Sequence, residues 1–134
     1  MTTTVTTRLK ITSWNEKGSE EHDDGSRTTR ATVALADGAD GLTSGTFESV
    51  MYYRPDGTSA YVSVLRLAAT LGGRSGSFVV TGDGGFDGTT ASSIGQVVAG
   101  SGTDGLAGIT GALSSASTHE DYPYMPLTLT YDLP

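Results

Sequence analysis

Short segments rich in Val, Leu, Tyr, Phe and Thr alternate along the chain with turns that contain glycine or proline. Pairs such as Asp37-Gly38 and Gly72-Gly73 suit turns, because glycine adopts positive φ without a steric penalty. No segment has the i, i+3, i+4 apolar spacing and the end caps of an amphipathic helix. The pattern therefore predicts eight β-strands, at residues 5–16, 27–36, 43–53, 59–71, 75–86, 89–100, 107–115 and 126–132.

Eight strands with short connections favour a closed up-and-down arrangement, because closure removes the unpaired edges of an open sheet. We therefore predict an all-β fold, a single eight-stranded antiparallel β-barrel that forms one domain over residues 1–134. A two-sheet sandwich is the alternative. An eight-stranded barrel has an interior that side chains fill or that holds one small ligand, so a function could lie inside it.

The composition supports this fold and narrows the function. Gly, Ser and Thr make up 55 of the 134 residues, but a charged fraction of 17% is low for a disordered chain. Threonine fits pleated strands and glycine fits tight turns. The absence of cysteine excludes a disulfide scaffold, a thiolate zinc site and a cysteine nucleophile.

The charge balance bears on partners and location. A net charge of −7, with 8 scattered Lys and Arg residues, argues against a nucleic-acid partner. No apolar run approaches the ~18–20 residues of a membrane span, and the first residues lack the features of a secretory signal. We expect a cytoplasmic protein without a membrane partner.

The best-defined hairpin surrounds Pro55 and Gly57, which suit a type I turn. A four-residue loop would pair Tyr53 with Thr58, and side chains alternate between the two faces of a strand. One face would hold Thr46, Glu48, Val50, Tyr52, Ser59, Tyr61, Ser63 and Leu65. Both this face and the opposite one are largely apolar, which predicts that the outer wall packs against another copy as a dimer or trimer.

Three residues of that face are candidates for catalysis. Inside a barrel, burial would raise the pKa of Glu48, which could then act as a general acid or base. The hydroxyl groups of Tyr52 and Tyr61 could orient a carbonyl group. The alternatives are a buried structural carboxylate, an outward-facing glutamate and tyrosines that only fill the core.

Further residues are candidates for contact with a substrate. Trp14 and Glu16 lie two positions apart and share a strand face, and an indole can pack on a conjugated ligand. His119 precedes the last strand and could serve as an acid or base near a barrel mouth. The other predicted contacts are Val50, Ser63, Leu65 and Phe78.

Metal, cofactor and phosphate sites are not expected. The acidic segment around His22 has no recognised ligand spacing and suits a solvated loop. The glycine-rich segments 72–76 and 82–85 have no following lysine or helix, so they do not match a phosphate-binding loop.

Several strings resemble a family of bacterial proteins, of an actinobacterial type, that adopts an allene oxide cyclase-like (calycin-like) β-barrel. They are Tyr53-Arg54-Pro55-Asp56-Gly57, Leu71-Gly72-Gly73-Arg74-Ser75-Gly76-Ser77-Phe78, Phe86-Asp87-Gly88, Gly100-Ser101-Gly102-Thr103 and Leu106-Ala107-Gly108, with Ser13-Trp14-Asn15-Glu16 and Leu129-Thr130-Tyr131-Asp132-Leu133 near the ends. The resemblance implies cyclisation of small, mostly apolar substrates. Leu65 stands where that family often has a glutamate, and Thr81-Gly82 where it has Gln-His, which makes the interior more apolar.

Three hypotheses follow. The first is a cofactor-free cyclase or isomerase, such as one that catalyses a pericyclic, Diels–Alder-type ring closure in polyketide biosynthesis, acting on an apolar conjugated substrate in the barrel. The second is a non-catalytic barrel that binds a small hydrophobic ligand. The third is a structural barrel with a fully packed core.

Overall fold

The computed structural model describes residues 2–134, which are almost entirely β-structure. Eight antiparallel strands follow one another in chain order, and the pairing of β8 with β1 closes the sheet into a ring. The predicted all-β class with eight antiparallel strands is thus confirmed. The elements are β1 (Thr3–Glu21), β2 (Arg27–Ala36), β3 (Leu42–Tyr53), β4 (Ser59–Leu71), β5 (Arg74–Phe86), β6 (Thr90–Val97), the 3₁₀ turn η1 (Asp104–Leu106), β7 (Thr110–Thr118), the 3₁₀ turn η2 (His119–Asp121) and β8 (Tyr124–Asp132).

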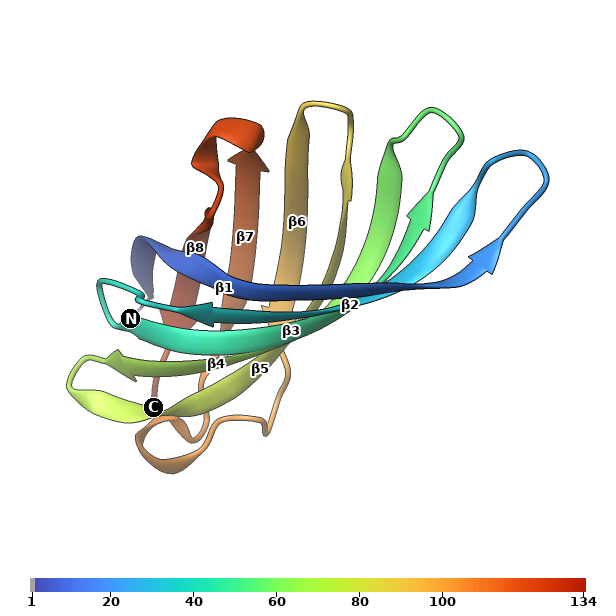
Figure 1. The fold of residues 1–134 in the computed structure, drawn as a ribbon. Helices are drawn as coiled ribbons and strands as arrows, with labels where there is room; N and C mark the ends of the chain where they lie inside the picture. Colours follow the sequence, from blue (N-terminus) through green and yellow to red (C-terminus); the bar gives the residue numbers. More distant parts are fainter. Residues whose placement is uncertain (1) are drawn as a thin grey trace.

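The two ends of the ring differ. The hairpins β1–β2, β3–β4, β5–β6 and β7–β8 turn at one end, along the upper and right-hand edge of Figure 1. The other connections and both chain termini lie at the opposite end. There the long β6–β7 connection, which includes η1, packs against β5: a Cβ on Gly76 would lie 2.1 Å from the carbonyl oxygen of Thr103.

The core is concentrated at this second end. Side chains from four strands and the β6–β7 connection are almost completely buried there, and they close that end of the ring with apolar contacts. They are Leu9, Leu42, Leu67, Leu71, Phe78, Leu106 and Ile109.

The β3–β4 hairpin differs from the prediction by one residue. Gly57 has a φ of 90°, and the backbone N–H of Arg54 donates to the carbonyl oxygen of Thr58 at 2.8 Å. The loop is therefore a three-residue turn with a left-handed glycine, and Tyr53 pairs with Ser59. A one-residue shift moves the side chains of one strand to the other face.

The shift corrects the predicted face. Glu48, Val50 and Tyr52 point outward and are exposed. Tyr61, Ser63 and Leu65 face inward as predicted, but opposite a different set of β3 residues: Met51, Ser49 and Phe47.

The outer surface carries an apolar area, but the predicted register assigns its β3 residues to the inner face. It comprises Val50, Tyr52, Val62, Val64 and Ile94, which are 40–70% exposed. Whether it packs against another copy stays a prediction. No helix within residues 2–134 has the length and apolar character needed to cross a membrane.

Candidate functional site

A cavity of about 850 Å³ occupies the half of the ring nearer the hairpin loops. Its lining extends from β1, β3, β4, β6, β7 and β8 and the end of β5 to the β5–β6 loop and η2. The deepest lining residues, next to the buried core, are Phe47, Leu65, Leu113 and Leu127. The cavity therefore has an apolar floor and a rim made of loops.

Hydroxyl groups line the wall above this floor. Ser49 and Ser63 are cross-strand partners on β3 and β4, and their hydroxyl groups hydrogen-bond to each other. On the neighbouring wall Ser93 of β6 pairs with Ser115 of β7. The Ser115 hydroxyl donates to the carbonyl oxygen of Pro126 at 2.7 Å. The wall is thus polar but uncharged.

Tyr61 contributes a phenol ring to the same wall. Its hydroxyl donates to the carbonyl oxygen of Ser92 at 3.1 Å and lies 3.4 Å from that of Gly85. Burial raises the pKa of Tyr61, so the phenol keeps its proton. Because that proton is used by the backbone, the hydroxyl offers a ligand mainly its lone pairs.

Glu16 is the centre of a hydrogen-bond network beside the cavity. Its carboxylate accepts bonds from Tyr53 Oη at 2.7 Å, Thr29 Oγ1 at 2.7 Å and Trp14 Nε1 at 2.9 Å. Burial alone would raise the pKa of Glu16, but these three donors and the charge of Arg27 outweigh burial and lower it. The carboxylate is therefore ionised and accepts three hydrogen bonds, which makes it a structural tie between β1, β2 and β3.

Tyr53 and Trp14 connect this network to the cavity that they line. Burial, together with the hydrogen bond to Glu16 and its charge, raises the pKa of Tyr53 to about 12. The guanidinium carbon of Arg27 lies 4.5 Å from the Tyr53 ring centroid. Trp14 packs edge-on against Phe47, with ring centroids 6.1 Å apart. The aromatic rings at this side of the rim are thus held in fixed positions.

The rim at η2 carries the imidazole of His119 and the carboxyl group of Glu120, which are both exposed. Asp121 fixes this turn by accepting from the backbone N–H of Thr118 at 2.7 Å. Tyr122, which follows the turn, is 66% exposed. A ligand that enters the cavity from this end passes these three side chains.

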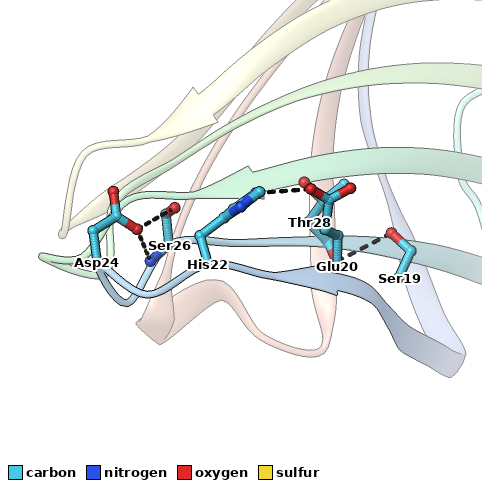
Figure 2. Close-up of polar contacts among 6 residues, drawn as sticks. All are labelled: Ser19, Glu20, His22, Asp24, Ser26 and Thr28. Atoms are coloured by element: carbon cyan, nitrogen blue, oxygen red, sulfur yellow. Dashed lines mark hydrogen bonds and ion pairs between the residues drawn. The ribbon is translucent and has the colours of Figure 1, made fainter.

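The tip of the β1–β2 hairpin holds a separate polar cluster, shown in Figure 2. His22 Nε2 lies 3.3 Å from Glu20 Oε1. Asp24 Oδ1 accepts from both the backbone N–H and the hydroxyl of Ser26, at 2.9 and 2.6 Å. These residues satisfy one another in a mostly exposed turn, as expected for a solvated acidic loop. Residues 2–134 contain no group of His, Cys, Asp and Glu that could hold a metal ion.

Comparison with known proteins gives the family. A family described as "Protein of unknown function (DUF3224)" matches residues 5–131. The chain belongs to the DUF3224 family. A crystal structure of a DUF3224 protein of unknown function from Shewanella oneidensis MR-1 is similar to this chain, with a TM-score of 0.73 and 19% sequence identity, over 100% of this chain and 99% of that one. No curated protein matches the sequence.

This DUF3224 chain brings together only part of the predicted site. Five predicted residues line the cavity: Trp14, Tyr61, Ser63, Leu65 and His119. Glu16 lies beside it through Trp14 and Tyr53. Glu48, Val50 and Tyr52 are outside, so the prediction that they face the interior is wrong. The prediction that Phe78 contacts a substrate from the lining is also wrong, because Phe78 is fully buried in the core below.

The sequence prediction missed several lining residues of this DUF3224 chain. Ser49, Met51 and Tyr53 alternate along β3 with the residues that were predicted, and only the register distinguishes the two sets. Gly57 is the signal that could have identified them. It is the fourth residue of the turn that starts at Arg54, and a left-handed glycine at that position is typical of a three-residue hairpin loop, which sets the register. Ser93 and Ser115 come from β6 and β7, where the sequence offered no distinctive motif.

Proposed function

We propose that this protein binds a neutral, largely apolar small molecule inside the ring of strands. The observation that carries the proposal is the cavity of about 850 Å³ with an apolar floor and an uncharged hydroxyl-bearing wall. Small-molecule sites are typically cavities of ~300–1,000 Å³ with a few placed polar groups in a mostly apolar lining.

The charges around the cavity favour a neutral ligand. Its described lining includes no lysine or arginine, so a buried carboxylate or phosphate would lose its hydration without gaining a counter-charge. The nearby acidic groups, Glu16 and Glu120, and the net charge of −7 further disfavour anions.

A cofactor-free cyclase or isomerase is the second candidate function. The wall of the cavity can hold a flexible conjugated substrate with its reacting ends close together, which is an orientational effect that needs no cofactor. Tyr61 is the predicted catalytic residue that lines this cavity, where its oxygen could orient a polar group of the substrate. The resemblance to allene oxide cyclase-like barrels supports the same hypothesis, including a Diels–Alder-type ring closure of a polyketide-like substrate.

Two fluorescent probes with the same aromatic skeleton test the binding proposal. N-phenyl-1-naphthylamine is neutral, whereas 8-anilinonaphthalene-1-sulfonate carries an added sulfonate. We expect the neutral probe to bind one site per chain, and the sulfonate to bind at least about ten-fold more weakly, a difference of about 1.4 kcal/mol. Equal affinity for the two probes would contradict a neutral interior site.

A matched pair of variants locates the binding. Ser93→Leu adds volume on the inner face of β6, whereas Ser92→Leu makes the same change on its outer face. The first variant should weaken binding of the neutral probe and the second should not.

Incubation with linear conjugated polyene precursors, followed by chromatography and mass spectrometry, tests catalysis. A product of unchanged mass supports the cyclase or isomerase, and binding without conversion supports the carrier.

A further inference from the structure

Ser59 is a buried polar residue without a protein partner. Its exposed fraction is only 6%, it lines the cavity near the β3–β4 turn, and its hydroxyl makes no hydrogen bond with any residue of the described chain. No enclosed side-chain nitrogen or oxygen within residues 2–134 lacks a hydrogen-bond partner, so the Ser59 hydroxyl is open to the cavity. Its position in the wall of the cavity makes a ligand the natural partner.

The Ser49–Ser63 pair leaves a second donor. The two hydroxyl groups share one hydrogen bond, which uses one of their two hydrogens. Neither hydroxyl group makes another hydrogen bond with a residue of the described chain, 2–134. One O–H group of the pair is therefore free to donate into the cavity.

Ser93 provides a third hydroxyl on a different wall. Its side chain faces the cavity from β6 and has no hydrogen-bond partner in the part of the chain that the structure describes. Strand β5 lies between this wall and the one formed by β3 and β4, and the β5 residues in register with Ser63 and Tyr61 are Gly82 and Gly84. The unpaired hydroxyl groups are thus placed on two walls, separated by a stretch of β5 without inward side chains.

We propose that the ligand is a neutral, largely apolar compound with two or more carbonyl, ether or hydroxyl oxygens, which hydrogen-bonds to Ser59 and the Ser49–Ser63 pair on one wall and to Ser93 on the other. This inference rests on the proposed function and adds the chemical class of the ligand. The apolar floor takes the hydrocarbon part of the compound, and the serines take its oxygens.

Hydrogen bonding and the hydrophobic effect predict opposite preferences between matched ligands. An oxygen-bearing compound is less favourable to transfer from water into an apolar site than a hydrocarbon of the same shape, unless its oxygens are hydrogen-bonded there. Flavone and 2-phenylnaphthalene form such a pair, since both are neutral aryl-substituted bicyclic molecules. A preference for flavone can therefore arise only from polar partners in the cavity.

The test is displacement of bound N-phenyl-1-naphthylamine by each compound, in wild type and in the variants Ser59→Ala, Ser93→Ala and the double variant Ser49→Ala/Ser63→Ala. Ser92→Ala, on the outer face of β6, is the matched control. We expect flavone to bind at least about ten-fold more tightly than 2-phenylnaphthalene, and each cavity variant to lose part of that preference while the control keeps it. Thermal unfolding of each variant verifies that it is folded.

Each outcome is decisive. Binding of flavone no tighter than the hydrocarbon, or a preference that all the serine variants keep, overturns the inference but leaves the proposed function intact, provided that the naphthylamine probe binds. Failure of that probe to bind overturns the proposed function, and the inference with it. Should one variant not fold, the other two still decide the result.

Discussion

At the scale of single residues, the wall beside the cavity is organised by one carboxylate. Glu16 joins three strands through Tyr53, Thr29 and Trp14, and it does so on a β1 segment that extends well past its pairing with β8. Hydrogen bonds to an ionised group are stronger than those between neutral groups. The aromatic rim of the cavity therefore depends on the charge of this side chain.

Replacing Glu16 by Gln should destabilise the protein by about 1 kcal/mol at neutral pH, after allowance for the partial solvent exposure of the carboxylate. The folded-state pKa of Glu16 lies below its ordinary value. Its stabilising effect is thus present above the unfolded-state pKa and is lost as the pH falls through the folded-state pKa. Chemical unfolding of wild type and Glu16→Gln from neutral to acidic pH measures this.

The difference between the two proteins should shrink at the acidic end of the series. A difference that is constant with pH would contradict an ionised Glu16 as the centre of the network. Thr29→Val removes one donor without removing the charge, and it should keep most of the pH-dependence.

At the scale of the elements, the sharpest requirement lies where β5 meets β6. A Cβ on Gly82 would stand 2.1 Å from the carbonyl oxygen of Ile94, a distance that no side chain tolerates. The glycine lets the two strands approach closely, which bends the wall of the ring next to the cavity.

Gly82→Ala should therefore lower the free energy of unfolding by about 1–3 kcal/mol, the usual effect of overpacking. Gly18→Ala is the matched control, because nothing lies within 4 Å of its Cβ position in β1. Thermal and denaturant unfolding of both variants are the measurements. Equal stability of the two variants would show that β5 and β6 are not this close.

Sequence patterns predicted the elements better than the site. Gly- and Pro-containing turns separate the strands clearly, so the number of strands and their approximate limits could be predicted. The inner face of β3 could not, because both faces of the β3–β4 hairpin carry apolar residues and alternation alone does not choose between them. The choice depends on the left-handed conformation of Gly57, which moved Glu48 and Tyr52 outside and Ser49 and Tyr53 inside.

At the scale of the whole molecule, stability and binding occupy opposite ends of the ring. The end that contains the termini is filled by leucines, Phe78 and Ile109, whereas the cavity lies at the end formed by the four hairpins. A filled end supplies a rigid base, so the other end can keep a cavity without loss of the fold. Substitutions at the two ends should accordingly affect stability and binding separately.

The outer surface predicts self-association. Across β2 to β5, one row of outward residues reads Arg30, Val50, Val62 and Asp83. A twofold axis along the strands between β3 and β4 would place each Arg30 opposite Asp83 of a second copy, with the valines in contact. Val62→Glu should therefore give a monomer where the wild type is a dimer, as measured by light scattering after gel filtration. Ser114→Glu, at an exposed position on β7 outside this interface, is the control, and a monomeric wild type at high concentration would contradict this interface.

The central claim, a ligand site inside the ring, is tested most directly by titrating the protein with N-phenyl-1-naphthylamine while the amide NMR spectrum is recorded. We expect saturable shifts at the inward positions Ser63, Leu65, Leu113 and Leu127. Shifts confined to the outer positions Val50, Val62 and Val64, with the inward ones unchanged, would contradict it.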